Sequence, residues 1–230
     1  MPGRQRANTE SVDNYLKAIL ALGGAEQVGR VPSKLLADHL EVAPASVTNM
    51  LQKLAGAATP LVEYERHRGV RLSASGKRRA LEVVRHHRLI ETFLYEILDY
   101  TLDEVHEEAE RLEHFISERF EERIAAKLGH PTTDPHGHAI PTLEGEMAAQ
   151  GSMRLTDVVQ DGTFTIESVS DRDSGNVRLI EACGMTPGAR LRVRKNLAEQ
   201  TYSVSVGRSL QEFDLSRDVA GDVRILPETK

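Results

Sequence analysis

The sequence predicts a mainly α-helical protein with a small β domain at its C-terminal end. Apolar residues recur at helical spacing through much of residues 8–128. Over residues 153–227 they alternate instead with polar residues, as in strands, and glycines separate the runs. No apolar run approaches the roughly 18–20 residues that cross a bilayer. The single cysteine, Cys183, leaves no intrachain disulfide possible, so we expect a cytoplasmic protein with no membrane attachment.

Two short helices joined by a tight turn are predicted after a first helix that ends at Gly23–Gly24. Pro44 suits the first turn of the second short helix, because the N–H that proline lacks has no partner there. The turn between the helices holds Glu41 and Val42, where glycine is frequent. A hairpin with Gly69 in its turn follows, which completes a winged helix-turn-helix. The expected elements are helices over 8–22, 33–40 and 44–54 and a hairpin over 61–73.

The rest of the chain divides into a helical part and a strand-rich part. A break near Asp99–Asp103 divides the helical pattern of residues 76–128 into two predicted helices. Residues 129–152 are rich in glycine, proline, histidine and threonine, which predicts a linker. Short runs such as Phe164-Thr165-Ile166, separated by turn residues, predict a small β-barrel.

The net charge of −6 is unevenly distributed along the chain. Residues 1–90 carry 14 basic and 8 acidic side chains, whereas residues 91–150 carry 4 basic and 15 acidic ones. A basic N-terminal third suits a polyanionic partner such as DNA. An acidic middle third suits a cation site or a solvated helical region. The alternative is a chance distribution of surface charge.

The second short helix of the helix-turn-helix has an apolar face with Val47 and Leu51 and an opposite, polar face. A helix of this kind lies in the major groove, where Asn49 or Gln52 can pair with adenine. Arg66 and Arg68 at the hairpin tip are placed to contact phosphates. The alternative is a three-helix domain that binds protein. The expected DNA-facing residues of the helix are Ala43, Ala45, Ser46, Thr48, Asn49, Gln52 and Lys53.

Histidines and carboxylates recur one helical turn apart in two neighbouring predicted helices. A pair spaced i, i+4 on the first helix faces a stripe about 100° wide on the second. Such a pairing predicts a site for Mn, Fe(II), Co, Ni or Zn, since imidazole and carboxylate suit these ions. The alternative is an ordinary charged helix face. The pair is His87 and Glu91, and the stripe is His106, Glu110, Glu113 and His114. We expect His130, His136 and His138, in the predicted linker, not to be ligands.

Several segments together resemble the diphtheria-toxin-repressor family of iron- and manganese-dependent regulators. The resemblance covers nearly the whole chain, and HHRLIE, DEVHEEAERLEH and LGHPTTDPHGHAIP carry it most specifically. It implies a metal-dependent transcriptional repressor of metal-uptake genes that binds a pseudo-palindromic double-stranded DNA operator as a homodimer. The implied domains are a winged helix-turn-helix over 1–76, a helical metal-binding and dimerisation domain over 77–145, a linker over 146–152, and an SH3-like domain of the ferrous-iron-transport A type over 153–230.

The resemblance also implies two metal sites. One uses His87, Glu91 and His106, and the spacing of the C-terminal domain offers Asp173 and Asn176 to complete it. The other uses Asn14, Glu110, Glu113 and His114, with Asp13 as an alternative to Asn14.

This chain departs from the family pattern at three positions. Asn14 replaces the methionine of iron-type members or the aspartate of a manganese-type subgroup, and Lys17 replaces that subgroup's glutamate, so its paired-metal arrangement is not carried over. Glu110 replaces the cysteine of iron-type members, and a site of only oxygen and nitrogen donors favours Mn(II). An Fe(II)-dependent regulator, a metal-independent regulator and a carboxylate-bridged di-metal enzyme are the alternatives. The enzyme would need Glu-x-x-His pairs, which this sequence lacks.

Overall fold

The computed structural model describes residues 2–24, 29–149, 151–196, 201–208 and 211–228. They form two compact units. Unit 1 comprises Met1–His86, Glu113–Ile116 and Pro141–Ala148, and unit 2 comprises His87–Leu112, Ser117–Ile140 and Ala149–Lys230. Among the described residues, no helix combines the length and the apolar character that crossing a membrane requires.

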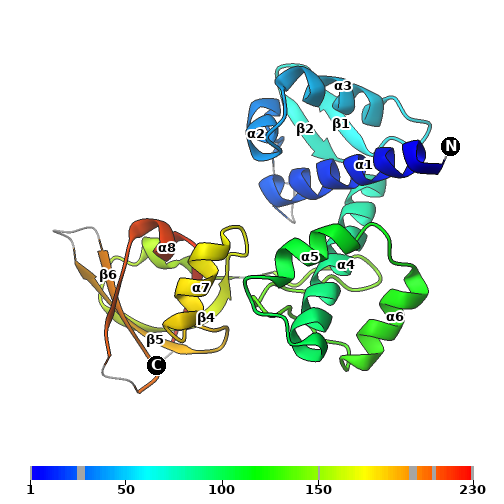
Figure 1. The fold of residues 1–230 in the computed structure, drawn as a ribbon. Helices are drawn as coiled ribbons and strands as arrows, with labels where there is room; N and C mark the ends of the chain where they lie inside the picture. The colour runs from blue at the N-terminus through cyan, green and yellow to red at the C-terminus, as the bar shows by residue number, and fades with distance from the viewer. Residues whose placement is uncertain (1, 25–28, 150, 197–200, 209–210, 229–230) are drawn as a thin grey trace. The chain divides into compact units, whose positions relative to one another are not determined.

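Unit 1 contains the predicted helix-turn-helix and wing (Figure 1). The side chains that occur at helical spacing meet in one apolar core, which includes Leu16, Ile19, Leu36, Val47 and Leu51, each fully buried. The hairpin pairs Val62 with Leu72 and Tyr64 with Val70. The elements are α1 (Pro2–Gly23), which begins earlier than predicted, α2 (Ser33–His39), α3 (Pro44–Ala55), β1 (Val62–Glu65) and β2 (Gly69–Leu72).

Glu41 and Gly69 are among the positions in unit 1 that have a positive φ. Glu41, in the turn where glycine is frequent, has φ of 53°, so a non-glycine residue takes the left-handed conformation there. Gly69, at φ of 96°, opens β2, and a Cβ atom at this position would lie 2.4 Å from the Val31 carbonyl oxygen. Val31 and Val70 exchange both backbone hydrogen bonds, so the segment before α2 approaches the wing too closely for any side chain at Gly69.

The helical pattern contains one more break than predicted. Helix α4 spans Ala74–Leu98, α5 spans Val105–Leu112 and α6 spans Glu118–Lys127. The predicted single helix after Asp103 is therefore wrong, because Glu113–Ile116 are not helical. Ser117 explains where α6 begins, since its side chain accepts a hydrogen bond from the Phe120 backbone N–H.

The predicted linker over residues 129–152 is also wrong for its first part. Asp134, His136 and Ile140 are buried, and Arg88 of α4 donates a hydrogen bond to the Ala139 carbonyl. The segment is irregular in backbone but packed, with a bridge between Thr133 and Ala139. Its polar composition reflects internal hydrogen bonds rather than exposure to solvent.

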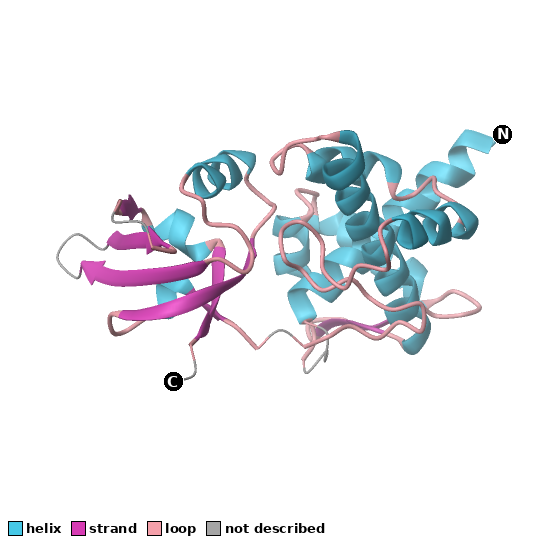
Figure 2. Ribbon diagram, turned by 90° about the horizontal axis from the view of Figure 1, so that it is seen from below, coloured by secondary structure: helices cyan, strands magenta, loops and turns pink. Residues whose placement is uncertain are grey.

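The C-terminal strands, predicted to form a small β-barrel, lie in one antiparallel sheet, seen as magenta arrows in Figure 2. Among the described residues the strand order is β3-β8-β4-β5-β6-β7. Fully buried side chains such as Ile166, Leu191 and Val204 face one core, as alternation requires. Two helices in this domain, α7 (Ser174–Ala182) and α8 (Arg217–Gly221), were not predicted. The other elements are β3 (Met153–Arg154), η1 (Leu155–Asp157), β4 (Gly162–Val169), β5 (Arg190–Asn196), β6 (Thr201–Val206), β7 (Phe213–Leu215) and β8 (Val223–Pro227).

Candidate metal centre and DNA-binding helix

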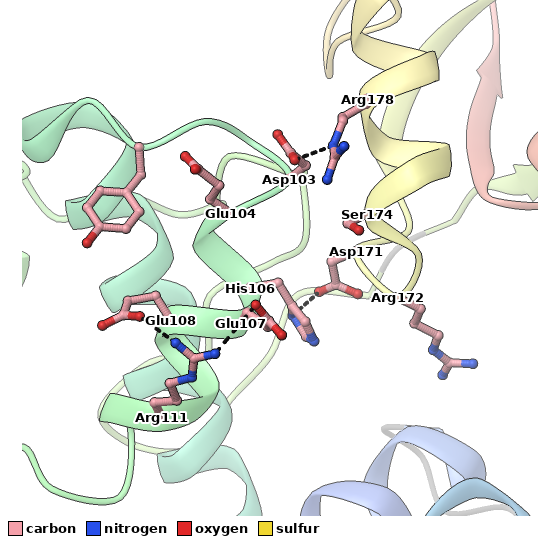
Figure 3. Close-up of a pocket in the computed structure, with 11 residues that line it drawn as sticks. Asp103, Glu104, His106, Glu107, Glu108, Arg111, Asp171, Arg172, Ser174 and Arg178 are labelled. Atoms are coloured by element: carbon pink, nitrogen blue, oxygen red, sulfur yellow. Dashed lines mark hydrogen bonds and ion pairs between the residues drawn. The ribbon is translucent and has the colours of Figure 1, made fainter.

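Four side chains from three parts of unit 2 converge around the Glu91 carboxylate, and we call them the Glu91 cluster: His87, Glu91, His106 and Asp171. Helix α4 places His87 Nε2 3.0 Å from Glu91 Oε1. Helix α5 brings His106 Nδ1 to within 3.4 Å of the same oxygen and 3.5 Å of Asp171 Oδ2. Asp171 precedes α7 and points at His106 (Figure 3). One ligand atom from each of the four residues lies within 4.8 Å of the others.

The Glu91 cluster concentrates negative charge that needs a cation. Burial alone would raise the pKa of Glu91, but His87 and His106 hold it well below its usual range. Burial would lower the pKa of His106, yet hydrogen bonds to Asp171 and Glu91 raise it to about 10. For Asp171, as for Glu91, burial alone would raise the pKa, but the hydrogen bond with His106 holds that pKa low. In this arrangement a protonated imidazole provides the positive charge, and a divalent ion bound to the same atoms would provide it instead.

A second group shares Glu91 and includes two residues that sequence reasoning missed, Asp134 and His136. His136 Nε2 lies 3.1 Å from the Leu102 carbonyl oxygen, which can only accept, so Nε2 carries the proton and donates it. The lone pair of His136 Nδ1 is then left facing Glu91 Oε1 at 3.8 Å. An imidazole held by a carbonyl through its far nitrogen is the usual orientation of a metal ligand.

Unpartnered buried atoms show that a cation fits this region. Glu91 Oε2 and His136 Nδ1 are buried without a hydrogen-bond partner, whereas Asp134 Oδ2 lies 3.3 Å from His138 Nδ1 and 3.5 Å from Arg88 Nε. Glu91 and His136 are 0% exposed, so water does not compensate for the missing partners. The two acceptors that face each other are the Glu91 carboxylate and His136 Nδ1, and a cation between them would stabilise both. The donors are oxygen and nitrogen alone, and His106 and Asp171 also line a surface pocket that gives access from solvent (Figure 3).

Asp173 and Asn176, predicted to complete this site from the C-terminal domain, make hydrogen bonds within that domain instead. Asp173 caps α7, where its carboxylate accepts a hydrogen bond from the Asn176 backbone N–H at 2.9 Å. The Asn176 side chain donates to Asp222 at 2.7 Å. Asp171, two residues before Asp173, is the residue of this loop that reaches His106. Glu110, expected in the other site, lies with Oε1 3.7 Å from His87 Nδ1.

The other predicted ligands lie in unit 1 and are Asn14, its alternative Asp13, Glu113 and His114. Together with Lys17, which is not expected to ligate a metal, they form what we call the Glu113 set. Glu113 and His114 belong to the turn after α5, and the other three lie on α1. Asp13 accepts a hydrogen bond from Arg79 Nε at 2.6 Å, and His114 Nδ1 lies 3.6 Å from its other oxygen. Burial would raise the pKa of Asp13, but His114 and Arg79 lower it.

The predicted DNA-facing residues of α3 form its solvent side. Val47, Leu51 and Leu54 are buried beneath the helix. Thr48 is half-buried, and its hydroxyl donates to the Pro44 carbonyl at 3.1 Å. At the wing, Arg68 pairs with Glu65. The exposed side chains are Ala43, Ala45, Ser46, Asn49, Gln52 and Lys53 on or beside α3, and Arg66 and Arg68 at the wing.

Comparison with known families matches nearly the whole chain. Residues 8–70 match the model of the iron-dependent repressor N-terminal DNA-binding domain. Residues 73–142 match the metal-binding and dimerisation domain of the same repressors, and residues 153–227 match the FeoA domain. The HTH-type transcriptional regulator MntR of Oceanobacillus iheyensis is 34% identical over 116 residues, which are 50% of this chain and 76% of that protein. The chain belongs to the iron-dependent repressor family.

Other members of the family resemble the chain over its full length. The iron-dependent repressor IdeR of Mycobacterium leprae is 27% identical and covers 94% of this chain and 96% of its own length. A manganese-dependent transcriptional repressor solved in complex with manganese is 34% identical, with a TM-score of 0.83 and coverage of 94% and 100% of the two chains. The resemblance expected from the sequence motifs is confirmed.

Family membership fixes the general roles of the parts. These repressors are DNA-binding, metal-dependent transcriptional regulators, so the di-metal enzyme is set aside. The DNA-binding family model includes α2, α3 and the wing. The metal-binding family model extends to residue 142 and thus includes Asp134 and His136, the residues that had been expected in a linker.

Proposed function

We propose that this protein is a Mn(II)-dependent repressor that binds a pseudo-palindromic DNA operator as a homodimer and controls metal-uptake genes in the cytoplasm. The observation that carries the proposal is the Glu91 cluster, in which a fully buried carboxylate is surrounded by imidazoles and a second carboxylate. The buried Glu91 carboxylate needs a positive charge beside it, which either a protonated imidazole or a bound divalent ion can provide.

The donor atoms favour manganese over iron. The Glu91 cluster and the adjoining Asp134 and His136 offer only carboxylate oxygens and imidazole nitrogens, a set that suits Mn(II). No thiolate belongs to either group, and Cys183 lies at the end of α7. A relative described as manganese-dependent supports the same choice. Fe(II) remains the alternative, since iron-dependent repressors are also similar to this chain.

The residues of unit 2 explain why binding would order the protein. Glu91 and His87 come from α4, His106 from α5 and Asp171 from the loop before α7. These side chains would hold a divalent ion together, and shared ligation would join the three segments and offset the charge of the carboxylates. His136 is held in position by the Leu102 carbonyl before any ion arrives. Metal binding that favours the DNA-competent state by about 1–3 kcal/mol is sufficient for regulation.

The assay is DNA binding by fluorescence anisotropy at fixed salt, with an operator selected from a random library and with Mn(II) or anaerobic Fe(II) in parallel. We expect Mn(II) to tighten binding of the unmodified protein at least tenfold, and to have no effect on Glu91→Gln. Glu82→Gln, an exposed carboxylate on the same helix, is the matched control and should respond as the unmodified protein does. Equal DNA affinity with and without either metal would contradict the proposal.

A further inference from the structure

The Glu113 set already contains a positive charge where the family pattern implies a metal. Lys17 Nζ donates to Glu113 Oε1 at 2.7 Å and to Oε2 at 2.8 Å, so both oxygens of the carboxylate face the ammonium. The Glu113 side chain is 0% exposed and that of Lys17 18% exposed, so little water separates them. Removing one partner of such a pair leaves an uncompensated buried charge, which is strongly unfavourable.

Charge is balanced in this set without a divalent ion. Lys17 neutralises Glu113, and Arg79 neutralises Asp13. The Glu91 cluster differs, because in the part of the chain that the structure describes the basic groups at ion-pair distance from Glu91 and Asp171 are histidines alone. A divalent ion at Glu113 would meet an ammonium within hydrogen-bond distance of its own ligand, and the two cations repel each other. The residues therefore do not fit a metal while Lys17 stays in place.

Donor atoms for a metal nevertheless remain beside Glu113. Asn14 Oδ1 and His114 Nδ1 are buried and have no hydrogen-bond partner. His114 Nε2 lies 3.3 Å from Glu113 Oε1. Removal of the ammonium would leave the Glu113 carboxylate beside the His114 imidazole, and Mn(II) accepts both kinds of donor.

We propose that Lys17 competes with divalent metal for Glu113 and acts as the resident cation of this set. Lys17 on α1 is thereby joined to the turn that holds Glu113 and His114 without any metal. The metal response of the protein is then concentrated at the Glu91 cluster. This inference rests on the proposed function only in taking Mn(II) as the ion.

The test is a Mn(II) titration that follows the electron paramagnetic resonance signal of the free ion. Glu91→Gln serves as the background, since it removes the carboxylate at the centre of the Glu91 cluster. We expect this variant to bind Mn(II) weakly, and the double variant with Lys17→Gln to bind at least tenfold more tightly. Adding Glu113→Gln should abolish the gain. Lys34→Gln, which removes an exposed lysine and the same charge, should produce no gain.

Lys17→Arg retains the cation and should keep binding weak, and circular dichroism checks that every variant is folded. An unchanged Mn(II) affinity in folded Lys17→Gln would overturn the inference, as would a gain that survives loss of Glu113. Failure of the proposed function has a different signature, namely DNA binding by the unmodified protein that ignores Mn(II).

Discussion

Replacing Asp171 by asparagine tests whether the C-terminal domain contributes a metal ligand. The Asp171 carboxylate lies 3.5 Å from His106 Nδ1, so a cation held by that nitrogen would face it at close range. At about 4 Å and an effective dielectric constant of about 20, one unit-charge interaction amounts to about 4 kcal/mol. Asparagine keeps an oxygen donor and loses the charge. We therefore expect Mn(II) affinity to fall by about 2–4 kcal/mol, which is roughly 30- to 700-fold.

Asp173→Asn is the matched control, two residues away in the same loop. Asp173 caps α7, and asparagine is an equally good N-cap residue, so stability and Mn(II) affinity should both stay within about twofold. Isothermal titration with Mn(II) measures both variants against the unmodified protein. In addition, the pKa of His106 should fall in metal-free Asp171→Asn, because one of the two carboxylates that raise it is gone. An equal loss of affinity in the two variants, or none in Asp171→Asn, would refute the assignment.

Three further outcomes are expected. Mn(II) affinity should rise about tenfold per pH unit between about pH 6.5 and pH 8.5. The reason is that the metal must displace the proton of His106, whose pKa is about 10. A Mn(II) affinity that does not change with pH would show that His106 is not a ligand. Asn49→Ala should reduce discrimination at one operator base pair by about 1–3 kcal/mol in competition binding, whereas an equal loss on all sequences would make Asn49 a positioning contact. In urea denaturation, Gly69→Ala should lower the free energy of unfolding by roughly 2–4 kcal/mol, because its Cβ meets the Val31 carbonyl. Gly129→Ala, also at positive φ but with open space around it, should cost only about 1 kcal/mol.

Elements with a regular period were predictable from the sequence. The apolar side chains of α2 and α3 and the His87–Glu91 pair repeat at helical spacing, and that spacing alone determines which of them share a face. The alternation of apolar and polar residues in β4, β5 and β6 likewise predicted that these segments are strands. The short break after Leu112 was missed, because the apolar and charged residues on either side continue the helical pattern without interruption.

Irregular segments carry no such period, and the site errors lie there. Spacing along the chain placed the C-terminal ligand near Asp173, whereas the loop before α7 turns so that Asp171 reaches His106. His136 was dismissed because a polar stretch with glycine and proline usually lies at the surface. Its burial depends on hydrogen bonds such as that from His136 Nε2 to the Leu102 carbonyl, which join residues 34 positions apart. No local sequence signal reports a contact at that separation.

The regional charge count predicted a cation site but did not locate it. Residues 91–150 carry 15 acidic and 4 basic side chains, yet the Glu113 carboxylate in this region is neutralised by Lys17 from the basic N-terminal third. Glu91 has no such partner, and the atoms around it are histidine nitrogens and other carboxylates. Two glutamates of equal burial therefore differ in what they require: one is already paired with a fixed ammonium, and the other needs a proton or a metal. Local pairing, rather than the density of acidic residues, decides where a divalent ion changes the free energy of the protein.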